Sequence, residues 1–122
     1  SMSPTMVFDP SGQLRLVTGS PGGNSIVAYV ARSTIGILAR GKAPSVVLGE
    51  PNVVARGNTV RFEARNDTEK AQARALADAG YKVKERDGEN SGLHVILVTE
   101  EGLVGEADPR REGKVAVPEG DN

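Results

Sequence analysis

Apolar and polar residues alternate along several short segments of the chain, as in strands that bury one face. Residues 5–9 and 13–18 are the first two such segments, and the turn residues of 10–12 between them predict a hairpin. Residues 93–98 carry the strongest strand signal of the chain, and the turn at Glu101-Gly102 leads into a further segment, 103–107. We expect these strands to pair in antiparallel fashion.

Two segments have helical length. Residues 24–40 are apolar on most sides and stop at Gly41, a residue suited to the left-handed cap position, so we expect a helix sandwiched between other elements. A second helix is expected to have Asp67 or Thr68 as its N-cap and to end at Gly80, with a narrow apolar stripe of Ala and Leu.

The segments around the second helix are less regular. Residues 45–48 and 52–55 are β-prone but are separated by glycine and proline, and strands are expected at 59–64 and, as the start of the last antiparallel group, at 81–84. The order of elements predicts an α+β fold in which helices pack on an antiparallel sheet.

Composition narrows the class of protein. The 122 residues have the length of one domain, and 15 basic against 16 acidic residues give no electrostatic reason to expect a nucleic acid or an acidic membrane as partner. The absence of cysteine excludes a disulfide framework and a thiolate zinc site, and no apolar stretch is long enough to span a bilayer. We expect one α+β unit over residues 1–111 and a polar, mobile tail over 112–122.

The run Gly19-Ser20-Pro21-Gly22-Gly23, between a strand and an apolar helix, is the main candidate for chemistry. A glycine pair lets two successive backbone N–H groups approach a ligand, and a helix N-terminus favours negative charge. An anion, a phosphate or a developing oxyanion would suit this place. The alternative is a tight turn whose glycines and proline serve backbone geometry alone. The sequence lacks the Gly-Lys-Ser/Thr of a P-loop and the glycine spacing of a dinucleotide site.

The other candidate residues are weaker candidates for a catalytic or metal site. His94 is the only histidine, and without a second histidine or a cysteine a metal site is not expected; a strand histidine facing solvent or a neighbouring element is the simpler interpretation. Residues 108–111 (Asp-Pro-Arg-Arg) suit either a carboxylate clamp or a salt-bridged turn. A Ser-His-Asp triad cannot be assembled around any of the serines considered, which are Ser1, Ser3 and Ser20.

The opening Ser1-Met2-Ser3-Pro4-Thr5, followed by Val17-Thr18-Gly19-Ser20-Pro21-Gly22-Gly23, resembles the γ-glutamyltransferase (glutathione hydrolase) family. The segment Gly105-Glu106-Ala107-Asp108-Pro109-Arg110-Arg111 is similar to the closing Gly-x-x-Asp-Pro-Arg of that family. The resemblance covers nearly the whole chain. It implies the C-terminal part of the small subunit of an N-terminal nucleophile hydrolase, and thus a portion of an αββα sandwich.

The resemblance also implies roles for a few residues. Gly22 and Gly23 match the catalytic glycine pair whose N–H groups form the family's oxyanion hole. Ser1 matches the second serine of a pair that binds the α-carboxylate of the γ-glutamyl group. For Asp108 and Arg110 we infer a structural role. No cofactor and no metal are implied, and the compartment stays unknown, since family members are often periplasmic, secreted or tethered outside the cell.

Several family features are absent. The nucleophilic threonine of the family is freed by autocatalytic cleavage and lies in a segment upstream of the first motif, which this sequence does not contain. Asn24 stands where a serine is usual, and Ser45 follows Ala43-Pro44 where the family continues Arg-Phe-His-His. Ser1 is not a natural start, so it remains from processing or cloning, or the chain begins within a longer polypeptide.

The resulting hypothesis is a fragment of a γ-glutamyltransferase-type hydrolase. Such an enzyme transfers the γ-glutamyl group of glutathione-like donors to water or amino acids through a threonine acyl-enzyme. We expect this chain to supply the oxyanion hole and part of the donor site, to need the N-terminal part of the same polypeptide, and to be inactive and self-associating alone. The alternative is a non-catalytic interaction or structural module that retained the fold.

Overall fold

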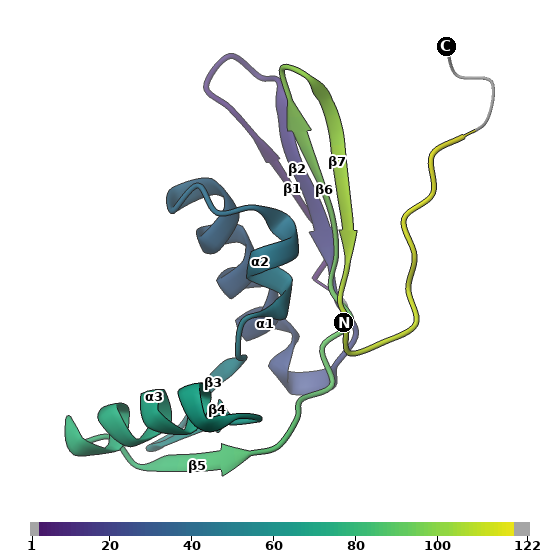
Figure 1. The fold of residues 1–122 in the computed structure, drawn as a ribbon. Coiled ribbons are helices and arrows are strands. Elements are labelled where there is room, and N and C mark those ends of the chain that lie inside the picture. Colours follow the sequence, from purple (N-terminus) through teal and green to yellow (C-terminus); the bar gives the residue numbers. More distant parts are fainter. Residues whose placement is uncertain (1–2, 119–122) are drawn as a thin grey trace.

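The computed structural model describes residues 3–118, whose strands form two sheets (Figure 1). The first sheet has the order β1-β2-β6-β7 with antiparallel pairing throughout, and it consists of β1 (Thr5–Phe8), β2 (Leu14–Gly19), β6 (His94–Thr99) and β7 (Gly102–Ala107). The predicted hairpin and the predicted pairing of the last two strands are confirmed.

The first sheet has one covered and one open face. Leu16, Thr18 and Val95 are buried on the face that helices cover (Figure 1), whereas Met6 and Ile96 on the opposite face are 63% and 44% exposed. Met6, Val17, Ile96 and Gly105 lie at matching register positions across the four strands. The open face is therefore apolar, and within the described residues no helix packs on it.

The long helix predicted for residues 24–40 is present in three parts. A 3₁₀ turn (Gly23–Ser25) leads into α1 (Ile26–Thr34), which continues as a π-helical turn (Ile35–Ala39). α1 lies between β2 and β3 and also contacts the next helix. The prediction of a helix sandwiched between other elements is therefore confirmed, although Val27 and Ile35 remain 68% and 52% exposed.

Residues 45–48, expected to be β-prone, are helical, and that expectation was wrong. Helix α2 (Pro44–Gly49) begins with a proline at its first position, where the fixed φ of proline is preorganised for a helix. The residues it buries, Pro44, Val47 and Leu48, have the spacing of one helical face. Packing of that face therefore outweighs the β-propensity of valine.

The second sheet contains β3 (Val53–Arg56), β4 (Thr59–Glu63) and β5 (Val83–Arg86), and α3 (Asp67–Asp78) connects the last two. The strand predicted at 81–84 begins two residues later and pairs parallel with β4, so its assignment to the last antiparallel group was wrong. The cause is the intervening helix, since a helical crossover brings two strands side by side in parallel. The N-cap of α3 is Asn66, whose side chain accepts from Glu69 N–H, rather than Asp67 or Thr68.

The main core lies between the covered face of the first sheet and α1 with α2, and it is composed of Leu16, Ile26, Tyr29, Val30, Ile37, Val47, Leu48, Val54, Leu93 and Val95. Only Val54 of this cluster comes from the second sheet. Among residues 3–118, no helix combines the length and the apolar character needed to cross a membrane.

Candidate functional site

The glycine turn (residues 19–23) connects the end of β2 to the start of the long helix. Gly22 and Gly23 have φ angles of 135° and 61°, a region that favours glycine because a Cβ clashes with the backbone there. Within residues 3–118, neither the Gly22 nor the Gly23 N–H donates a hydrogen bond to another residue. The turn therefore presents two consecutive free donors at a helix start, an arrangement that can accept negative charge.

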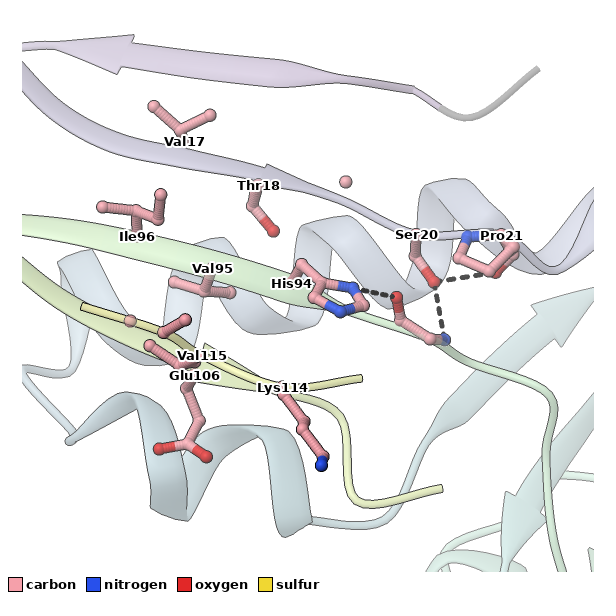
Figure 2. A pocket seen from close by; sticks show the side chains of 14 residues that line it. Val17, Thr18, Ser20, Pro21, His94, Val95, Ile96, Glu106, Lys114 and Val115 are labelled. Atoms are coloured by element: carbon pink, nitrogen blue, oxygen red, sulfur yellow. Dashed lines mark hydrogen bonds between the residues drawn. The ribbon is translucent and has the colours of Figure 1, made fainter. Parts of the chain in front are cut away.

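The polar loop that precedes β6 packs directly on the glycine turn. Ser20 Oγ accepts a hydrogen bond from Gly92 N–H at 3.0 Å and donates to the carbonyl oxygen of Pro21 at 2.7 Å (Figure 2). Ser20 is 1% exposed, so its hydroxyl serves the structure of the turn. The nearby carbonyl of Asn90 accepts from Arg111 Nη2 at 2.7 Å, which ties the loop to the end of the β7 segment.

A buried tyrosine forms the inner wall of the turn. Tyr29 of α1 is 2% exposed, and a Cβ added at Gly22 would lie 2.6 Å from its Cε2 atom. The Tyr29 hydroxyl donates to Glu89 Oε1 at 2.6 Å. Burial, followed by this carboxylate, raises the pKa of Tyr29, so the phenol stays protonated and remains a donor.

Arg61 of β4 holds the other side of the same carboxylate. Its Nε lies 3.1 Å from Glu89 Oε2 and its Nη2 lies 2.9 Å from Glu89 Oε1, a bidentate pair. Arg61 Nη2 also donates to Ser25 Oγ, at 2.7 Å. Burial alone would raise the pKa of Glu89, but the hydrogen bonds from Arg61 and Tyr29 outweigh it and leave that pKa below its ordinary value.

Arg110 occupies the centre of a second, deeper ionic network. Its guanidinium pairs with Glu63, which is fully buried, and with Asp108 at 3.0 Å. It also donates to the carbonyl oxygens of Leu48 and Glu50, at 2.7 and 2.8 Å. Between the two interpretations of residues 108–111, the salt-bridged turn is confirmed: the partners of Arg110 are groups of the chain itself.

The two networks are joined through Glu63. Burial would raise the pKa of this carboxyl group, but Arg110 and the Asn52 N–H hold it below its ordinary value. Glu63 Oε2 also accepts from the Glu89 N–H at 2.9 Å, so the residue that holds Tyr29 is itself anchored to the Arg110 network. Asp108 Oδ2 accepts a hydrogen bond from Ser91 Oγ at 2.6 Å, which gives the loop before β6 a second anchor beside the bond from Glu89 N–H to Glu63.

The other sequence candidates lie as follows. Ser1 lies outside the described residues, and its assigned role in substrate binding stays a prediction. His94 is exposed on the open face of the first sheet, as predicted, and its Nδ1 lies 3.1 Å from the carbonyl oxygen of Gly92 (Figure 2). No group of three histidine, aspartate or glutamate side chains among residues 3–118 is arranged to hold a metal ion.

A pocket of about 450 Å³ adjoins the outer side of the glycine turn (Figure 2). Val17 and Ile96 contribute its apolar floor on the open sheet face, and His94 and Pro21 bound it towards the turn. Lys114 and Val115 of the C-terminal segment also line it. A small apolar group next to the glycine turn would fit this pocket.

The sequence did not predict the role of three residues near the turn: Tyr29, Arg61 and Glu89. In the sequence Tyr29 belongs to an apolar helix, Arg61 to an alternating strand and Glu89 to a polar loop. No spacing rule links positions so far apart in the chain, and only the tertiary structure brings them together. An isolated tyrosine hydroxyl in an otherwise apolar helix was the one available signal, because a buried phenol requires a partner.

Comparison with known proteins identifies a family and similar folds. The sequence model of the family described as Gamma-glutamyltranspeptidase matches residues 1–118. No curated protein sequence matches the chain significantly. Among solved structures, Gamma-glutamyltranspeptidase from Pseudomonas nitroreducens complexed with L-DON has a TM-score of 0.79 at 22% identity, over 97% of this chain and 62% of that chain.

Two further solved structures are similar. The T380A mutant of Helicobacter pylori gamma-glutamyltranspeptidase has a TM-score of 0.73 at 25% identity, over 91% of this chain and 61% of that chain. The Bacillus anthracis transpeptidase enzyme CapD has a TM-score of 0.75 at 21% identity, over 96% of this chain and 70% of that chain. These likenesses support the α+β fold, and the chain spans less than two thirds of the Pseudomonas and Helicobacter chains.

Proposed function

Because the chain belongs to the gamma-glutamyltranspeptidase family, we propose that it is part of an enzyme that transfers the γ-glutamyl group of glutathione-like donors to water or amino acids. In this proposal Gly22 and Gly23 form the oxyanion hole. One observation carries it: both N–H groups lie free and consecutive at a helix start, in backbone conformations that favour glycine.

The chemistry follows from those two donors and a threonine supplied by a segment that precedes the chain. The threonine Oγ attacks the γ-carbonyl carbon while its proton passes to the threonine's own α-amino group. The carbonyl oxygen becomes an oxyanion, which accepts from the N–H groups of Gly22 and Gly23. Collapse of this intermediate breaks the C–N bond, the amine leaves with the proton, and an ester remains. Water or an amino acid then attacks the ester and releases the threonine.

Ser1 completes the proposal on the substrate side. Its hydroxyl would donate to the α-carboxylate of the γ-glutamyl group, beside a second serine from the preceding segment. Thr5, the first residue of β1, lies opposite Thr18 of β2, the strand that ends in the glycine turn.

The open face of the first sheet supports the view that further chain packs on this unit. Met6 and Leu103 are 63% and 72% exposed, and an apolar face of this kind excludes water only when another layer covers it. In the proposal this layer is the N-terminal part of the same polypeptide. Without it we expect the isolated chain to self-associate, and a monomer in light scattering at high concentration would contradict that expectation.

The experiment compares the isolated chain with the complete polypeptide, using a chromogenic γ-glutamyl anilide. We expect no turnover by the chain alone, and turnover by the complete protein. In the complete protein, Gly23→Val keeps the backbone N–H but disfavours the φ of 61°, so it should displace this donor from the oxyanion. We expect kcat to fall by up to about 10²–10³-fold, the effect of losing one oxyanion donor, with a much smaller change in KM. Gly49→Ala is the matched control, because a Cβ there meets no atom within 4 Å.

Two results would overturn the proposal. Clear turnover by the pure isolated chain would show that the nucleophile lies within it. Absence of turnover by the complete, folded protein, together with absence of glutathione binding in a titration, would favour the non-catalytic interaction module instead.

A further inference from the structure

The geometry points to Tyr29 as a positioning residue for the glycine turn: its ring, held by Glu89 and Arg61, fixes the backbone of Gly22 so that the N–H groups of Gly22 and Gly23 stay directed outward. The inference rests on the proposed function for its catalytic consequence, although the contacts that carry it are independent of any substrate.

The ring acts on Gly22 by contact. A Cβ at Gly22 would lie 2.6 Å from Tyr29 Cε2 and 3.2 Å from Tyr29 Cδ2, so the backbone of Gly22 passes against the edge of the ring. The carbonyl oxygen of Asn90 lies 3.6 Å from the same Cβ position, on the loop that precedes β6. Gly22 is therefore confined between a helix side chain and a loop, and its φ of 135° is maintained by that confinement.

The hydroxyl fixes the direction of the ring. A phenylalanine would fill the same core space, but the Tyr29 hydroxyl donates to Glu89 Oε1 at 2.6 Å. The carboxylate of Glu89 is itself held by two bonds from Arg61 and is 8% exposed. A charge-assisted bond to a fixed, nearly buried carboxylate restricts the ring more than apolar contacts do.

Arg61 also binds the segment that follows the glycine pair. Its Nη2 donates to Ser25 Oγ at 2.7 Å, and Ser25 ends the 3₁₀ turn that begins at Gly23. The Tyr29 ring therefore contacts Gly22, and Arg61 holds the end of the turn that follows. Since Tyr29 and Arg61 both bond to Glu89, loss of this carboxylate would loosen both contacts at once.

Three variants of the complete polypeptide test the role of Tyr29. Tyr29→Phe keeps the ring and removes the bond to Glu89, Glu89→Gln keeps the shape and removes the charge, and Tyr29→Ala removes the ring. We expect kcat to fall about tenfold in Tyr29→Ala and less in the other two, with KM changed less than about twofold, because a displaced donor weakens only the transition state. Tyr81→Phe is the matched control, since Tyr81 is 57% exposed.

A second measurement does not depend on activity. The complete polypeptide labelled with ¹⁵N-glycine should show shifted amide resonances of Gly22 and Gly23 in Tyr29→Phe and Glu89→Gln, and unchanged ones in Tyr81→Phe. Resonances of distant glycines such as Gly57 report whether each variant is folded. If Tyr29→Ala fails to fold, Tyr29→Phe and Glu89→Gln alone test the positioning role.

The outcomes separate this inference from the proposed function. Altered glycine amides together with a selective fall in kcat support both. Altered amides in a protein that turns over no γ-glutamyl substrate support the positioning role and overturn the proposed function. Unaltered amides and unaltered kcat in Tyr29→Phe and Glu89→Gln overturn the inference and leave the proposed function intact.

Discussion

The two sheets of the chain are stabilised by different interactions. The first sheet packs on α1 and α2 through an apolar cluster, whereas the second sheet buries the charged residues Glu63 and Glu69 and the polar Asn52 beside it. Most of the ion pairs among the described residues involve the second sheet or its connections, namely Arg61–Glu89, Arg65–Glu63, Arg65–Glu69 and Arg110–Glu63.

This difference explains how the glycine turn can be partly exposed and still be held in one position. Apolar side chains of similar volume substitute for one another, so an apolar core determines the position of a helix only loosely. A buried ion pair has a defined direction, and it is unfavourable when misplaced. The turn lies where the two kinds of packing meet, because Tyr29 belongs to the apolar cluster and its hydroxyl bonds to Glu89 of the ionic side.

The largest loss of stability is expected when the ion pairs around the second sheet are broken at Arg110. Arg110→Ala leaves Glu63, which is fully buried, without its closest cation, and removal of one partner of a buried pair destabilises by about 3–5 kcal/mol. The free energy of unfolding, measured by urea denaturation and circular dichroism, should fall by that amount. Lys42→Ala is the control: its pair with Glu50 is 39% and 34% exposed, and a change below about 1 kcal/mol is expected.

A smaller effect is expected from a cavity on the apolar side. Leu16 is fully buried in the core cluster, so Leu16→Ala should destabilise the chain by about 3 kcal/mol through lost burial and the space left behind. In hydrogen exchange, protection should fall mainly in the first sheet. Equal loss of protection in α3 and β5 would show that the two sheets unfold as one unit, and it would contradict the distinction between the apolar first sheet and the ionic second sheet.

Acid should weaken the ionic side selectively. The pKa values of Glu63 and Glu89 are both lowered in the folded chain from an ordinary 4.5, so their contribution to stability is complete above that value and is lost as the pH falls through the lower folded-state values. The urea midpoint should therefore decrease from pH 5 towards pH 3. Glu89→Gln removes one of these groups and should flatten the decrease; an identical slope would exclude Glu89 as a contributor.

The smallest effect is expected at the start of α3. Asn66 Oδ1 accepts from Glu69 N–H at 2.9 Å, and replacement of such an N-cap by alanine destabilises by about 1 kcal/mol. Asn66→Ala should lower the urea midpoint slightly. Asn66→Asp keeps the acceptor and should preserve it, so equal losses in both variants would assign the effect to something other than the cap.

The sequence predicted the first sheet better than the second. Residues 13–18 alternate because helices cover one face of the strand and not the other, and residues 93–98 form an apolar, partly β-branched run interrupted only by His94. The prediction for residues 45–48 was wrong because a proline start and three buried positions outweighed valine propensity. The strand predicted at 81–84 begins later and pairs with another strand than expected, because pairing across α3 depends on tertiary packing. Local patterns determine which face a strand buries, but not which strand lies beside it.

For the site, the sequence located the glycine turn but not what holds it. Gly22 and Gly23 stand out because the backbone conformations they adopt favour glycine. The residues that hold the turn include Arg61 and Glu89, which look like ordinary surface charges in the sequence. Their significance depends on a hydrogen bond to Tyr29, and such contacts between distant positions leave no periodic signal.

The pairing of β2 with β6 has a topological consequence. Gly19 lies opposite His94, so every residue from 20 to 93 forms one excursion that leaves the first sheet and returns to the neighbouring strand. The entropy of closing such an excursion grows only with the logarithm of its length, by about 0.6 kcal/mol for each doubling. The second sheet can therefore gain or lose residues at its hairpin tips with little penalty to the first, which makes it the part of the fold where insertions can accumulate while the glycine turn stays in place.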